Sequence, residues 1–209
     1  MDGALSVAMR EGSAAEHRAA EESPFVAELL AGRLRPVAYA DLLLRLRLVY
    51  GALETAVRRQ AHDPVVAAVH DPVLERRAAI DADLAYWARG ADPAAVHSPA
   101  TDAYVARLAG ADAHGLVAHH YTRYLGDLSG GQAIARALVG TYGRQAAVQF
   151  FDFAIERVKP YKDAYRSRLD ALDLTDRERR DLVAEVRVAF GLNRALFAEL
   201  GAALPAYRR

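Results

Sequence analysis

The run 121–132 combines glycines with charged side chains inside a helical pattern. Each glycine lowers helix propensity by about 1 kcal/mol relative to alanine, so this stretch is costly to keep helical. Gly126 and Gly130 are four residues apart and share one helical face, which therefore lacks side chains. Such a bare, bendable face is typical of a close helix–helix crossing, of a break between two helices, or of a flat, bulky ligand lying against the backbone.

A charged pair accompanies this bare face. Asp127 follows Gly126 directly, and Arg123 lies four residues before Asp127. This spacing brings opposite charges together on a helix, so we expect Arg123 to keep Asp127 ionised. A polar group beside an apolar cavity is typical of sites that position water or pass protons.

A histidine in the first helical segment is a candidate metal ligand. The sequence contains seven histidines: His17, His62, His70, His97, His114, His119 and His120. His17 has Ala14 and Ala20 three residues to either side, so a flat ligand can lie against its face while the imidazole binds a metal. The adjacent pair points about 100° apart on a helix, and the other four fall near turns or helix ends. We interpret these six as non-ligands.

The segment 157–168 is strongly basic. Its cations are Arg157, Lys159, Lys162, Arg166 and Arg168, and its one acid is Asp163. Lys162 and Arg166 are four residues apart on one face, as a pair that clamps carboxylates requires. A solvated basic face is the alternative interpretation.

Helices must position all these residues, because apolar side chains recur at helical spacing along almost the whole chain. The predicted helices are 13–22, 25–31, 36–60, 71–89, 99–108, 112–142, 160–172 and 175–200. Ser13 with Glu16 and Thr175 with Glu178 have the spacing of capping boxes, and Pro36 suits a first helical turn. Gly90 to Pro93 is expected to end the fourth helix. We predict one all-α domain over residues 1–209.

Composition excludes several classes of protein. The chain has 209 residues, no cysteine, and 27 basic against 27 acidic side chains. Without cysteine there is no disulfide, thiolate metal site or covalently attached c-type haem, and zero net charge argues against a nucleic-acid partner. No run approaches the roughly 18 apolar residues that span a bilayer, and no signal peptide is present. We expect a cytoplasmic protein.

The string YTRYLGDLSGGQ (121–132) resembles the distal-helix signature of the heme oxygenases. Segments 9–21, 48–54, 161–168 and 189–193 are similar to other helices of that family and follow in the same order. The resemblance implies a multihelical fold that holds haem between a proximal helix and a kinked distal helix. It also implies that haem b is both cofactor and substrate, and that O₂ and external electrons convert it to biliverdin, CO and ferrous iron.

The resemblance assigns roles to individual residues around the iron. His17 corresponds to the proximal iron ligand, and Glu21 lies one turn onward, where it can orient the imidazole. Gly126 and Gly130 would let the backbone lie close above the ring and steer O₂ toward one meso carbon. Asp127 would anchor a water network for proton delivery, and Arg123 and Tyr50 are implied as further members of it.

Other implied haem contacts lie at the mouth of the pocket. Lys162 and Arg166 correspond to propionate clamps, and Arg10, Tyr121 and Phe190 to further haem-contacting positions. Arg10 stands where lysine is common in the family, which keeps the charge and changes the geometry.

The resemblance also bears on partners. It implies an electron donor such as ferredoxin with its reductase, or a flavoprotein reductase. The sequence reaches Arg209 without an apolar C-terminal anchor, so the resemblance is to the soluble bacterial branch.

Two other functions fit parts of the pattern. A non-catalytic haem carrier would keep His17 but has no need of Asp127 beside glycines. A di-iron carboxylate oxidase usually places Glu-x-x-His pairs on facing helices, and no glutamate here has a histidine three residues later.

Overall fold

The computed structural model describes residues 3–88 and 96–209, and it is built from helices. The α-helices are α1 (Leu5–Gly12), α2 (Ala14–Glu21), α3 (Pro24–Leu30), α4 (Pro36–Arg59), α5 (Pro64–Ala67), α6 (Arg77–Trp87), α7 (Pro99–Ala109), α8 (Ala113–His120), α9 (Gln132–Tyr142), α10 (Val158–Asp170), α11 (Asp176–Ala202) and α12 (Leu204–Tyr207). Short 3₁₀ turns occur at Pro72–Leu74 and Gln149–Phe151. The predicted all-α class is confirmed.

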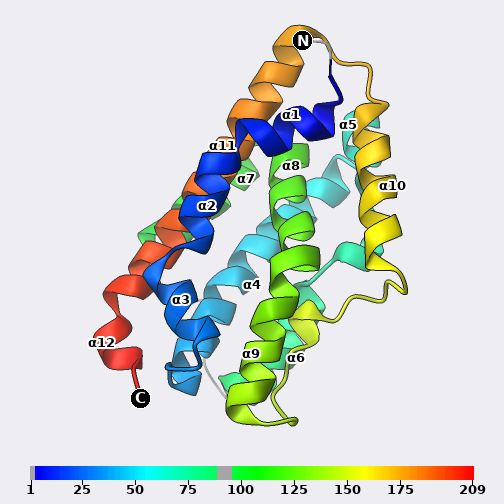
Figure 1. Ribbon diagram of the computed structural model, residues 1–209. Coiled ribbons are helices and arrows are strands. Elements are labelled where there is room, and N and C mark those ends of the chain that lie inside the picture. Colours follow the sequence, from blue (N-terminus) through cyan, green and yellow to red (C-terminus); the bar gives the residue numbers. More distant parts are fainter. Residues whose placement is uncertain (1–2, 89–95) are drawn as a thin grey trace.

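Two long helices organise the packing. α11 contacts α1, α2, α3, α7 and α8, and α4 contacts α6, α7 and α8. In Figure 1, α8 and α9 (green) follow each other through the middle of the molecule, with α2 (blue) on one side and α10 (yellow) on the other. The apolar positions predicted in α4 are buried: Leu42, Leu43, Leu46, Val49, Tyr50, Leu53 and Val57. In the described part of the chain, no helix is both long enough and apolar enough to cross a membrane.

The start of the first helical segment differs from the prediction. Helix already begins at Leu5, and α1 ends at Gly12 directly before α2. Ser13 precedes α2 without making a side-chain cap: its backbone, at φ −120° and ψ 12°, is not extended, and its hydroxyl donates to Met9 O at 2.7 Å. The predicted Ser13–Glu16 capping box is therefore wrong, because α1 leads almost directly into α2 and the Ser13 side chain turns back onto α1 instead of toward the first turn of α2.

Most other boundaries match closely. Asp112 caps α8 through the Gly115 N–H, and the capping box of Thr175 with Glu178 opens α11. The fourth predicted helix divides into the 3₁₀ turn at Pro72–Leu74 and α6. Its predicted ending at residues 90–93 lies outside the described residues.

The predicted helix 112–142 is helical throughout but widens inside the glycine motif. π-helical turns occupy Tyr121–Leu125 and Asp127–Gly131, between α8 and α9. Such turns are rare and occur frequently at functional sites, because the extra residue per turn redirects side chains. The break therefore lies where the glycines predict it.

Hydroxyl side chains stabilise the widened turns. Thr122 Oγ1 donates to Ala118 O at 2.8 Å, and Ser129 Oγ donates to Leu125 O at 2.7 Å. Bonds from Ser or Thr to the carbonyl four residues earlier are associated with helix bending. They supply donors to carbonyls of a helix whose regular ladder is interrupted.

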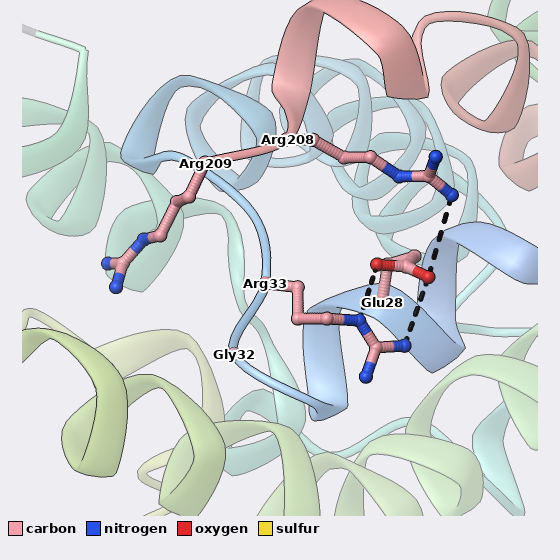
Figure 2. Close-up of a pocket in the computed structure, with 5 residues that line it drawn as sticks. All are labelled: Glu28, Gly32, Arg33, Arg208 and Arg209. Carbon is pink, nitrogen blue, oxygen red and sulfur yellow. Dashed lines mark hydrogen bonds and ion pairs between the residues drawn. The ribbon is translucent and has the colours of Figure 1, made fainter.

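The C-terminal residues are fastened to the turn after α3. Arg209 N donates to Arg33 O at 3.1 Å, and Arg33 pairs with Glu28 through Nε at 2.8 Å. Figure 2 shows Arg33 and Arg208 both reaching Glu28, whereas the Arg209 side chain points away from it. The residues drawn in Figure 2 line a surface pocket that shares no residue with the predicted site. The ion pairs in this pocket join the C-terminal residues to α3 and the turn that follows it.

A buried ion cluster joins α7, α8 and α11. Glu185 accepts hydrogen bonds from Arg107, through Nε at 2.7 Å, and lies 3.0 Å from Nε2 of the fully buried His119. Burial alone would raise the pKa of Glu185, but Arg107 and His119 outweigh it and lower the pKa to about 2. The ionised carboxylate therefore stabilises the folded chain.

We predict that Glu185→Gln lowers the free energy of unfolding at neutral pH, and that the loss relative to the unchanged protein shrinks in acid. A carboxyl whose folded pKa is depressed stabilises above its unfolded value, near 4.5, and this stabilisation disappears as pH falls toward about 2. Urea unfolding of both proteins across that range measures the difference. A difference independent of pH contradicts the assignment.

Candidate functional site

Arg123 joins three elements in the core of the molecule. Its Nε and Nη2 donate to the Tyr50 hydroxyl of α4 at 3.0 and 2.9 Å, and its Nη1 donates to Asn193 Oδ1 of α11 at 2.6 Å. Its Nη2 also lies 3.6 Å from Asp127 Oδ1, as the four-residue spacing predicts. The guanidinium therefore fixes the widened helix against both long helices.

The direction of each hydrogen bond in this network follows from the donors available. A phenol has one hydrogen and two lone pairs, and Arg123 donates twice to the Tyr50 oxygen. The Tyr50 hydrogen is then donated to Asp127 Oδ2. Since Asp127 Oδ2 must accept, the network favours the ionised carboxylate.

Burial and charge act against each other at this carboxylate. Burial raises the pKa of Asp127, while Arg123, the Tyr50 hydrogen bond and the more distant Arg76 act to lower it, and the net direction is upward. Burial disfavours the Arg123 cation, but Tyr50 and Asp127 outweigh it and raise the pKa of Arg123. Asp127 is thus a buried carboxyl with a cation 3.6 Å away, and its pKa lies above that of an exposed aspartate.

Gly126 and Gly130 lie on an open face of the same segment. A Cβ built at either position meets nothing within 4 Å outside the local helix. The predicted bare face is therefore confirmed as open, and it is not a tight helix–helix crossing. A planar group has room to lie against this backbone.

His17 lies on α2 with an accessible ring. Its side chain is 47% exposed, and its Nε2 is 3.5 Å from Glu21 Oε1, one turn onward. Phe190 of α11 packs edge-on against the imidazole, with ring centroids 5.2 Å apart. The carboxylate can pair with one ring nitrogen while the other binds a metal.

α11 supports both sides of the candidate site. Phe190 contacts His17, and Asn193, three residues later, binds Arg123. Residues three apart lie on neighbouring positions of one helix face. One turn of α11 therefore sets the position of the histidine on α2 and of the charged network on the widened helix.

The predicted cationic residues of α10 lie beside the glycine motif. Lys162 Nζ donates to Ser129 Oγ at 3.0 Å, and Arg166 Nη1 donates to Asp163 Oδ1 at 3.1 Å. Burial first, and Arg166 second, lower the pKa of Lys162. A cation such as Lys162, whose charge a neighbouring cation disfavours, is an environment in which an added anion is favourable.

Two further predicted residues extend this cationic region. Burial raises the pKa of Tyr121, and the charges of Arg166 and Arg10 oppose that rise. Arg10 itself is exposed and pairs with Glu11 at 3.4 Å. Cations from α1 and α10 thus both act electrostatically on the Tyr121 hydroxyl.

The adjacent histidines have structural partners. His119 pairs with Glu185, and the His120 Nδ1 lies 2.8 Å from the Tyr165 hydroxyl. Burial lowers the pKa of His120 to about 3, which keeps its ring neutral. Across the described residues, no group of three or more His, Cys, Asp or Glu side chains forms a metal site.

Sequence reasoning missed two members of the site. Asn193 anchors Arg123, and Ser129 receives Lys162. A buried asparagine on an otherwise apolar helix face signals a required partner, but that partner is 70 residues away in the sequence.

The fold and site together define an all-α protein with a half-exposed histidine on one helix, a glycine-bared helix carrying a buried anion, and cations at the rim. The sequence profile of the heme oxygenase family matches residues 3–199. The heme oxygenase of Porphyra purpurea is 34% identical over 98% of this chain and 89% of its own length. Heme oxygenase 1 of Rattus norvegicus is 36% identical over 96% of this chain and 72% of its own length.

Solved structures of the same family have the same fold as this chain. Heme oxygenase-1 of the cyanobacterium Synechocystis, crystallised in complex with heme, superposes with a TM-score of 0.90 at 32% identity, covering 98% of this chain and 96% of its own. The heme oxygenase of Leptospira interrogans gives a TM-score of 0.89 at 32% identity, covering 94% of this chain and 100% of its own. This chain belongs to the heme oxygenase family.

We predict that Arg123→Met lowers the free energy of unfolding by about 3–5 kcal/mol, because it leaves Asp127 buried without its cation. The matched control is Arg177→Met: Arg177 and Asp181 are also four residues apart and 3.6 Å from each other, but their side chains are 86% and 69% exposed. That variant should lose less than about 0.5 kcal/mol. Urea unfolding measures both, and equal losses would contradict the network.

Proposed function

We propose that this chain cleaves haem to biliverdin, CO and ferrous iron, with His17 as the iron ligand and Asp127 as the residue that organises proton delivery. The observation that carries the proposal is the buried Asp127–Tyr50–Arg123–Asn193 network beside the open face of Gly126 and Gly130. Family membership and the heme complex of the Synechocystis relative support haem as the ligand.

The residues present fit haem on both faces. His17 has an exposed ring braced by Glu21 and Phe190, and an imidazole so oriented is a common haem ligand. On the widened helix, Gly126 and Gly130 leave open space where side chains would stand, which would receive the other face. When bound, haem supplies the iron that activates O₂ and is also the molecule that is oxidised.

Asp127 and its partners would then control water and protons. Tyr50 occupies Asp127 Oδ2, and Arg123 lies 3.6 Å from Oδ1, beyond hydrogen-bond distance. Asp127 Oδ1 can therefore hold a water molecule, while Tyr50 and Arg123 fix the direction in which the carboxylate points. With its pKa raised, the carboxylate takes up and releases a proton of that water more readily near neutral pH than an exposed aspartate does.

The rim cations would bind the two propionates. Lys162 and Arg166 share one face of α10, and Arg10 and Tyr121 lie toward the same region. A charge-assisted bond from each cation to a carboxylate fixes the ring's rotation in its plane. The electron donor would be a ferredoxin with its reductase or a flavoprotein reductase in the cytoplasm.

We predict that the haem complex, supplied with ascorbate and O₂, forms biliverdin and releases iron. Asp127→Asn keeps the side-chain volume but removes the anion, so biliverdin formation should fall by about a hundredfold or more while haem still binds. Absorption spectra and bilin extraction measure both. A persistent haem spectrum in the unchanged protein would indicate a haem carrier, and full activity in the variant would remove Asp127 from proton delivery.

The iron ligand has its own test. His17→Ala should abolish the spectrum of imidazole-ligated haem, and added imidazole should restore it by occupying the vacated space. His62→Ala, at an exposed position after α4, is the control and should leave the spectrum unchanged. An unaltered spectrum in His17→Ala would show that another residue binds the iron.

A further inference from the structure

The three glycines of the motif have different surroundings. Gly126 and Gly130 face open space, whereas a Cβ at Gly131 would lie 2.7 Å from Phe151 Cδ1 and 3.1 Å from Cε1. Real Cβ atoms essentially never lie within 3.0 Å of a non-bonded heavy atom. Gly131 is therefore required by Phe151, not by the open face, and the Phe151 ring rests directly on the widened helix.

The Phe151 ring cannot easily move away. It is 4% exposed and packs against the Phe150 ring, with centroids 4.6 Å apart. Phe151 O accepts a hydrogen bond of 2.8 Å from Gln132 Nε2, at the start of α9. The glycine helix and the segment that carries Phe151 are thus joined by a hydrogen bond next to the ring contact.

The segment itself is anchored to the body of the protein. The fully buried Asp83 of α6 accepts from the backbone N–H groups of Gln149 and Phe150, both at 2.9 Å. At its other end, Arg76 Nη1 donates to Asp152 O at 2.9 Å. The Arg76 guanidinium also lies 3.9 Å above the Phe153 ring.

We propose that Phe151 is a specificity-determining residue. Its ring limits how closely the widened helix can approach, and the position of that helix determines the meso position at which haem is attacked. This inference rests on the proposed function. Phe150, its neighbour, packs against the Tyr50 ring with centroids 5.4 Å apart. The same short segment therefore supports both the helix that carries Asp127 and the tyrosine that binds Asp127.

The physical effect of a change at this contact has a definite direction. A methyl group at Gly131 must push the helix away from Phe151, and Gly126 and Gly130 move with it. A smaller residue at 151 lets the helix approach. A displacement near 1 Å at a catalytic site can reduce turnover up to about a hundredfold, while His17 on α2 is left in place.

The test is a cycle of Gly131→Ala, Phe151→Leu and the double variant, with Gly140→Ala as control. Gly140 lies on α9, and a Cβ there meets nothing within 4 Å. We expect Gly131→Ala to reduce kcat by on the order of tenfold to a hundredfold and to change the ratio of biliverdin isomers, with little change in haem affinity. Phe151→Leu should also shift the ratio, and the double variant should return both toward the unchanged protein.

Each outcome decides the inference. An isomer ratio in Gly131→Ala and Phe151→Leu equal to that of Gly140→Ala would overturn it, and so would a double variant no closer to the unchanged protein than the singles. If Gly131→Ala does not fold, the ratio in Phe151→Leu alone decides. Absence of biliverdin from the unchanged protein would refute the proposed function instead.

Discussion

The buried guanidinium of Arg123 is the interaction on which the candidate site depends. A cation this deep is stable only where its hydrogens meet acceptors, and Tyr50, Asn193 and Asp127 surround it from different elements. The three contacts reinforce each other. Arg123 uses both acceptor positions of Tyr50, which directs the Tyr50 hydrogen to Asp127, and both contacts favour the charged form of a carboxylate whose burial favours the neutral form.

The backbone of the widened helix, residues 121–131, departs from a regular helix at the point where it carries this network. Glycines and π-helical turns make the segment 121–131 poor as a regular helix, so neighbouring elements must set its path. Lys162 bonds to it from α10, and Phe151 packs against it from the segment after α9. The segment therefore has weak helix propensity, but its glycines leave an open face against which a flat ligand can fit, with the Asp127 carboxylate beside it.

Helix periodicity predicted the elements because their apolar faces are continuous, and the Arg123–Asp127 contact followed from a four-residue spacing. Local spacing also explains why Thr175 caps α11. The capping role of Ser13 was predicted wrongly because a helix already precedes it: its backbone is not extended and its hydroxyl turns back to Met9 O, which only the path of the chain reveals. The role of Tyr50 was inferred from the family resemblance.

Contacts between distant elements could not be predicted this way. Asn193 meets Arg123 across 70 residues, and Phe151 meets Gly131 because Asp83 fixes the intervening segment. No local pattern encodes these distances. The four-residue spacing put Gly126 and Gly130 on one face and gave Gly131 no role, and only packing shows that Gly131 receives an aromatic ring.

The central claim is that Asp127 is ionised in a buried site. Infrared difference spectroscopy of protein labelled with ¹³C at the aspartate carboxyl, taken against labelled Asp127→Asn at neutral pH, measures this directly. The account predicts that the variant loses the bands of one ionised carboxylate. Loss of a protonated carboxyl band instead would contradict it, because Asp127 would then be neutral and the charge of Arg123 would be unmatched.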